Sequence, residues 1–154
     1  MLNIIKSALV FLLLANCSFS QKKKLESFSA LYDNLTTGEN VTAVIEYGKA
    51  SLISDSGKSK SIDAIGGMKL LPFEYFPKMS VRNEKAFIAC SESVLISHPR
   101  YGFVINFVKI RFYDDDSVEI IAKYLDPLTY SIKMEELFKT RINNKTGGAV
   151  ILYK

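Results

Sequence analysis

Histidine and cysteine are scarce in this 154-residue sequence, which has one histidine, two cysteines and no tryptophan. With His98 as the sole histidine and no CxxC motif, the usual zinc sites cannot form. His98 stands between Ser97 and Pro99, a context typical of a turn, so we do not expect it to act as a general base. Gly66-Gly67 lacks the pattern of a phosphate-binding loop. We therefore expect no catalytic residue, no metal ion and no cofactor.

No apolar run is long enough for a transmembrane segment. Residues 8–15 form a continuous apolar stretch, but a membrane span needs about 20 such residues. Lys6 precedes the stretch and small residues follow it, which is the pattern of a signal peptide. We predict that residues 1–20 are removed by cleavage between Ser20 and Gln21. The protein is then secreted or periplasmic.

Two other interpretations of the N-terminal segment stay open. Leu14-Ala15-Asn16-Cys17 has the outline of a lipoprotein box, in which Cys17 would carry a lipid anchor. Asn16 stands where a small residue is expected immediately before that cysteine. The apolar run could also be a buried helix or strand of the fold.

The charge of the predicted mature chain is nearly balanced. Removal of residues 1–20 takes away Lys6 and no acidic residue, so the net charge falls from +4 to +3. The surplus lies in Lys22, Lys23 and Lys24, which we expect to form a solvated terminus. A nucleic-acid partner needs cations spread over one face, so we expect none.

Cleavage would leave Cys90 as the only cysteine, so no disulfide can form within the chain. It follows an apolar run at residues 86–89, and no basic residue or histidine adjoins it to lower its pKa. We expect Cys90 to be a small buried side chain.

The composition predicts one folded domain over residues 21–154, because 48% of the residues are hydrophobic and 23% are charged. Apolar residues at three- and four-residue spacing predict one short helix at residues 24–35, followed by a stop at Gly38. Beyond residue 41 the apolar period changes to two, which indicates strands.

Several of these strands can be placed. Residues 103–113 and 117–124 should form a hairpin around Asp114-Asp115-Asp116, and residues 148–153 should form a closing strand. Phe107 is expected at the centre of a strand covered on both faces. Large residues should face inward: Phe112, Tyr124, Met134 and Phe138. The predicted fold is mainly β, an antiparallel meander forming a small barrel or a strongly bent sheet, with one short N-terminal helix.

Two polar patterns are possible sites. The aspartate run lacks the alternating oxygen ligands of a calcium loop, so we interpret it as a solvated turn. Three sequons make Asn34, Asn40 and Asn144 possible glycosylation sites if the source glycosylates.

The order of these segments resembles that of the VirK-like family of small exported proteins. The resemblance rests on the signal peptide, the short helix and residues 41–47, 63–68, 84–89, 103–113 and 118–120. It implies an exported, mostly β domain and no particular activity. Members of the family carry two cysteines at positions that match Ala50 and Thr140 here, so the resemblance implies that one disulfide has been lost as a unit.

We therefore expect a secreted domain that acts by binding rather than catalysis. One hypothesis is a barrel that holds a small apolar ligand, for which a cavity above about 300 Å³ would be evidence. Another is a protein-interaction domain whose interior is filled by its own side chains. An enzyme of unknown type is the third choice.

Overall fold

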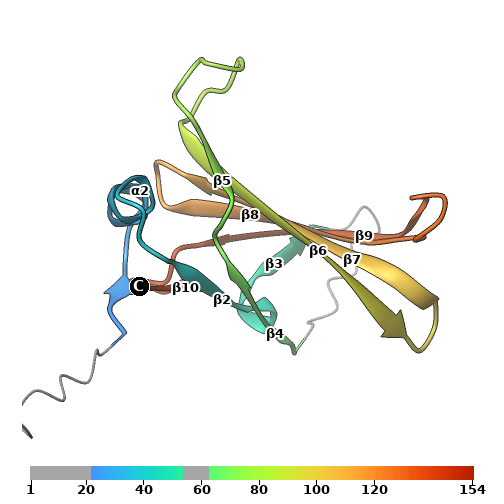
Figure 1. Cartoon of the computed structure of the whole chain (residues 1–154). Helices are drawn as coiled ribbons and strands as arrows, with labels where there is room; N and C mark the ends of the chain where they lie inside the picture. The colour runs from blue at the N-terminus through green and yellow to red at the C-terminus, as the bar shows by residue number, and fades with distance from the viewer. Residues whose placement is uncertain (1–21, 54–62) are drawn as a thin grey trace, which may run out of the picture.

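The computed structural model describes residues 22–53 and 63–154, which form two antiparallel sheets and one α-helix (Figure 1). The prediction of a mainly β fold with one short helix near the N-terminus is confirmed. The smaller sheet contains, in spatial order, β1 (Lys24–Leu25), β10 (Val150–Tyr153), β2 (Thr42–Glu46) and β4 (Ile65–Lys69). The larger sheet contains, in spatial order, β3 (Ser51–Ile53), β9 (Ile132–Arg141), β8 (Ser117–Leu125), β7 (Gly102–Tyr113), β6 (Phe87–His98) and β5 (Phe73–Phe76).

The larger sheet is twisted and open, so the barrel alternative is wrong. Barrel closure would require its edge strands β3 and β5 to pair with each other, but each edge strand connects to the smaller sheet instead. The 3-10 helix η1 (Tyr47–Lys49) leads from β2 to β3, and residues 70–72 lead from β4 to β5. These crossings hold one face of the larger sheet against the smaller sheet.

Strands β6 to β9 form a meander, as predicted. In the β7–β8 hairpin, Phe112 pairs with Val118 and Ile110 pairs with Ile120 around the aspartate turn. Figure 1 shows that the far ends of these four strands extend beyond the smaller sheet.

The helix α2 (Phe28–Thr36) begins four residues later than predicted. Lys24 and Leu25 form β1 instead, because they pair with the last residues of β10. Ser27 then caps the helix by accepting a hydrogen bond from the Ala30 amide at 3.2 Å. In the part of the chain that the structure describes, no helix has the length and apolar character that a membrane span requires.

The core lies between α2, the smaller sheet and one half of the larger sheet. Inward side chains of β6 to β9 fall into rows that run across the strands. The first row is Ile88, Phe112, Val118 and Thr140, and the second row is Cys90, Ile110, Ile120 and Phe138. All of these except Thr140 are buried. The helix covers them with three buried side chains, Phe28, Leu31 and Leu35.

The expectation that the central strand is covered on both faces is wrong. Val104, Ile110 and Phe112 of β7 are buried, whereas Phe107 points to the opposite face and is only half-buried. The smaller sheet and the helix both pack on one side of the larger sheet (Figure 1). The apolar character of the first half of β7 therefore indicates an outer surface that is apolar and partly exposed.

The predicted closing strand is present as β10, which pairs with β1 on one side and β2 on the other. Its residues Val150 and Leu152 are fully buried. Gly148 leads into the strand with a φ of +120°, and a Cβ there would lie 2.6 Å from the carbonyl oxygens of Arg141 and Ile142. This position therefore requires glycine.

Candidate functional site

The inner face of the larger sheet changes character beyond the core. The third row across the strands is Glu92, Val108, Ala122 and Glu136, and the fourth row is Val94, Asn106, Tyr124 and Met134. The small side chain of Ala122 leaves space between two larger neighbours, and the glutamates stand at the two ends of their row. The packed core therefore gives way to an open, partly polar surface.

These two rows and the facing edge of the smaller sheet enclose a cleft of about 370 Å³, which we call the inter-sheet cleft. Ile45, Met68 and Phe138 form its deep apolar part, next to the core. The opposite wall is the backbone of Gly66 and Gly67 in β4. Its volume lies within the range of small-molecule sites.

Tyr47 closes one side of the cleft. Its ring packs edge-on against Phe138 with the centroids 5.0 Å apart. A Cβ at Gly66 would lie 3.0 Å from Tyr47 Cε2, so the lack of a side chain at Gly66 leaves room for this ring beside β4. Burial raises the pKa of the Tyr47 hydroxyl, and the nearby Tyr124 and Glu136 raise it further. The phenol therefore stays neutral and can serve as a hydrogen-bond donor.

The charge of the cleft is negative. Glu92 and Glu136 have no ion-pair partner within residues 22–53 and 63–154, although seven other acidic side chains there do. None of the described residues that line the cleft is a lysine, arginine or histidine. Such a site favours a ligand that brings a positive charge.

A second hollow, of about 650 Å³, lies on the outer face and includes Lys85, Arg111 and Glu119. Its lining carries both signs of charge, and two of its basic groups are already paired, because Arg111 Nη1 lies 2.9 Å from Glu119 Oε1 and Lys85 binds Asp115. We therefore regard the inter-sheet cleft as the candidate site.

Sequence reasoning found only part of this site. Phe112 and Phe138 are buried in the core, as expected of inward residues, and Phe138, Tyr124 and Met134 line the cleft. Glu92, Asn106 and Glu136 were missed. Cys90, Glu92 and Val94 are spaced by two residues, as on one face of a strand, which signals that the strand at residues 86–90 continues. Their position relative to Glu136 depends on strand register.

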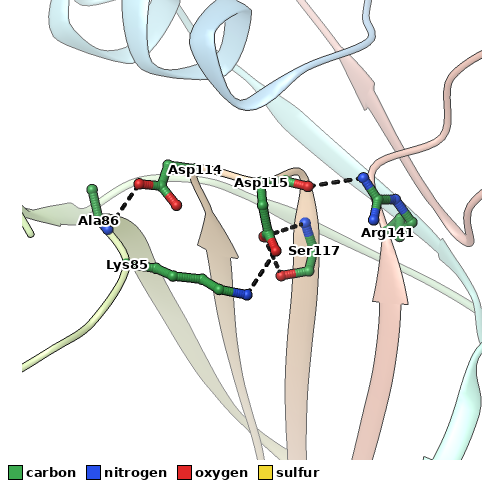
Figure 2. Close-up of polar contacts among 6 residues, drawn as sticks. All are labelled: Lys85, Ala86, Asp114, Asp115, Ser117 and Arg141. Carbon is green, nitrogen blue, oxygen red and sulfur yellow. Dashed lines mark hydrogen bonds and ion pairs between the residues drawn. The ribbon is translucent and has the colours of Figure 1, made fainter.

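The aspartate turn does more than face solvent (Figure 2). Asp114 Oδ2 accepts a hydrogen bond from the Ala86 amide at 3.2 Å, and Asp115 Oδ2 lies 2.6 Å from Lys85 Nζ. Arg141 Nη2 donates to the Asp115 carbonyl at 2.8 Å. The turn is exposed to solvent at Asp114 and Asp115, as interpreted from the sequence, and its aspartates also link the hairpin to neighbouring segments.

Asp116 links the same turn to the helix. Its Oδ1 accepts a hydrogen bond from the amide of Phe28, the first residue of α2, at 2.7 Å. Its own carbonyl accepts from the Ile142 amide at 3.0 Å, and its φ is +64°. The turn is therefore a structural junction between α2, β6 and β9. Within the described residues, no three His, Cys, Asp or Glu side chains gather as a metal site would require.

His98 and Cys90 lie where the sequence predicted. His98 ends β6, and its Nδ1 accepts hydrogen bonds from the amides of Arg100 and Tyr101 in the turn. Cys90 is a free, buried thiol in β6. Burial raises the pKa of this thiol to about 12, so it is an unreactive core side chain.

The three sequons lie in different settings. Asn40 is exposed before β2, whereas Asn34 lies in α2 and donates from Nδ2 to the Ala30 carbonyl at 2.7 Å. Asn144 uses its Oδ1 to accept from Thr146 in a turn. Asn40 is thus the most accessible of the three predicted glycosylation sites. Cys17, Ser20 and Gln21 lie outside the described residues.

Comparison with known proteins identifies the family. A family model described as VirK protein matches residues 24–130, which is more than half of the chain. The chain belongs to the VirK family. This confirms the resemblance drawn from the order of the segments. No curated protein matches the chain.

A solved structure supports the fold of this VirK family chain. It is the crystal structure of a VirK family protein from Legionella pneumophila, with a TM-score of 0.66 and 12% sequence identity. The match covers 85% of this chain and 98% of the other. At this identity the likeness shows the fold alone.

The register also places the two positions that match family cysteines. Ser51, the first residue of β3, pairs with Lys139 of β9. Extending this register by one residue sets Ala50 opposite Thr140, the arrangement that one disulfide would require.

Proposed function

We propose that this chain is an exported, non-enzymatic binding domain whose inter-sheet cleft holds a small ligand with an apolar body and a cationic group. The observation that carries the proposal is the combination of an apolar floor with Glu92 and Glu136, which have no ion-pair partner among the described residues. An apolar body gains by leaving water, and a cationic group gains from a hydrogen bond with one of the two carboxylates.

The arrangement of the carboxylates favours binding over catalysis. Glu92 and Glu136 stand on β6 and β9, whose backbones are three strand spacings apart, or about 14 Å. The two carboxylates thus come from opposite ends of a row of four strands rather than from adjacent positions. The imidazole of His98 is held by its own turn rather than directed at a carboxylate.

Calorimetry with two matched amphiphiles tests the proposal. We expect n-octylammonium to bind the protein and n-octanoate to bind at least about tenfold more weakly, because only the ammonium group complements the glutamates. Glu136→Gln should weaken n-octylammonium binding by about tenfold or more, the usual effect of losing a charged partner.

Glu135→Gln is the matched control, because Glu135 is the next residue on β9, points to the outer face and pairs with Lys123. This control should leave binding unchanged. Equal binding of both amphiphiles, or equal effects of the two variants, would contradict the proposal.

Export rests on the N-terminal pattern of a signal peptide. Intact-mass analysis of protein recovered from its source tests it. A chain that begins at Gln21 supports secretion or release into the periplasm. A lipid on Cys17 would instead indicate a membrane-anchored protein, and a retained leader would contradict export by cleavage.

A protein partner is the second candidate, favoured by exposed apolar side chains at the far ends of the long strands. They lie on β6, β7 and β9 and on the turn before β9, with the following exposed fractions: Leu95 61%, Phe103 68%, Leu128 88%, Tyr130 67% and Ile132 54%. Exposed apolar side chains gathered at one end of a sheet are candidates for an interaction surface. Loss of a co-purifying protein in Phe103→Glu, with n-octylammonium binding unchanged, would support this candidate.

A further inference from the structure

Half of strand β6 has an unpaired edge. On the side away from β7, β5 pairs with β6 only as far as the Phe73 and Cys90 pair. From Ser91 to His98, no residue that the structure describes pairs with that side. The burial of the side chains changes at the same point of the strand. Ala89 and Cys90 are buried, whereas Val94 and Leu95 are 47% and 61% exposed.

Such an edge is unusual for a monomeric protein. Exposed edges present a row of unsatisfied backbone groups, and natural proteins shield them with lysine, proline, bulges or very short strands. The open part of β6 is eight residues long and contains neither lysine nor proline, and Glu92 is its one acidic residue.

We propose that two copies of this chain associate by antiparallel pairing of this edge of β6, with Leu95 of each copy on the two-fold axis. A two-fold axis between identical antiparallel strands must run perpendicular to the sheet. The inner faces of the two copies then lie on the same side of the joined sheet. Even-numbered residues therefore oppose even-numbered residues and odd-numbered residues oppose odd-numbered ones, which leaves few possible registers.

The register centred on Leu95 is the one in which every pair is complementary. Leu95 meets Leu95, Val94 meets Ile96, Ser93 meets Ser97, and Glu92 meets His98. Pairs of apolar residues, of hydroxyl residues and of acid with base are the ones that stabilise neighbouring strands. An axis one residue earlier would place Glu92 against Ile96 and Ser93 against Leu95.

The state of His98 suits its proposed partner. Its Nδ1 accepts hydrogen bonds from the amides of Arg100 and Tyr101 at 3.1 and 3.3 Å. The neutral ring therefore carries its proton on Nε2. The Nε2 group makes no hydrogen bond within residues 22–53 and 63–154, so it can donate to a carboxylate of Glu92 from the other copy.

Cysteine cross-linking in a Cys17→Ser background tests the register, because the remaining native cysteine, Cys90, is buried. Under mild oxidation Leu95→Cys should form a covalent dimer. Ser93→Cys and Ser97→Cys should each stay monomeric, because identical positions there lie about 13 Å apart along the strands, beyond disulfide reach. A mixture of these two variants should cross-link. Equal cross-linking of all three variants, or none at Leu95→Cys, would overturn the proposal.

Sedimentation equilibrium tests the association without a covalent bond. The unmodified protein should dimerise, and Leu95→Glu should remain monomeric because it opposes two like charges at the axis. Phe103→Glu is the control, since Phe103 is at least as exposed on the neighbouring β7 but lies away from the edge. A monomer at millimolar concentration, or equal behaviour of both variants, would overturn the proposal. Glu92 belongs both to this edge and to the inter-sheet cleft, so the ligand test uses Glu136→Gln, because Glu136 lies on β9 away from the edge.

Discussion

Two phenylalanines of β7 point to opposite faces of the larger sheet and should contribute differently to stability. Phe112 is fully buried and Phe107 is half-buried. Phe112→Ala should lower the free energy of unfolding by about 3 to 5 kcal/mol, because it leaves a cavity in the core. Phe107→Ala should cost only about 1 kcal/mol, the typical value for a point substitution. Urea denaturation measures both, and equal losses would contradict the assignment of the faces.

Asp115 should make stability depend on acid pH. Hydrogen bonds from Lys85 and Ser117 lower the pKa of its carboxyl below the usual range. The unfolded chain then binds a proton more readily than the native one, so this stabilisation is present above about pH 4 and is lost as the pH falls below it. Denaturation midpoints at pH 6 and pH 3 should differ less in Asp115→Asn than in the unmodified protein. Identical pH profiles would show that the contact contributes nothing.

At the scale of the elements, Asp116 acts as a second cap for α2 because it accepts from the Phe28 amide. Asp116→Ala should cost about 1 to 2 kcal/mol, since it removes the acceptor and places alanine at a positive φ. Asp116→Asn keeps an oxygen acceptor and tolerates this φ, so its loss should be smaller. Thermal denaturation compares the two variants, and an equal loss of stability in both would contradict the capping role of Asp116.

Local sequence signals predicted some elements well and others poorly. The β7–β8 hairpin followed from alternating residues on either side of three aspartates, because turn chemistry acts within a few residues. The start of α2 did not, because Lys24 and Leu25 pair with β10 at the other end of the chain. Phe107 was misplaced because a strand's apolar pattern does not say which face of the strand another element covers. The cleft could not be predicted, because Glu92 and Glu136 come into one row only through the register of four strands.

At the scale of the whole molecule, a covalent link between Ala50 and Thr140 should stabilise the fold. If the register of Ser51 with Lys139 extends by one residue, Ala50 and Thr140 oppose each other at the separation of paired strand residues, which a disulfide can span. Ala50→Cys with Thr140→Cys should raise the free energy of unfolding by about 2 to 4 kcal/mol, reduced by about 1 kcal/mol because Thr140 Oγ1 no longer accepts from the Ala149 amide. Thermal denaturation with and without reductant measures the gain. A double variant that stays reduced would contradict the register at this edge.

The central claim is that the inter-sheet cleft binds a ligand, and amide chemical-shift mapping with n-octylammonium tests it most directly. The account predicts that the largest shifts fall on Val108, Ala122 and Glu136, and that Ala122→Phe, which fills the cleft, abolishes them. Shifts confined to the outer face around Phe103, or shifts that persist unchanged in Ala122→Phe, would contradict the account.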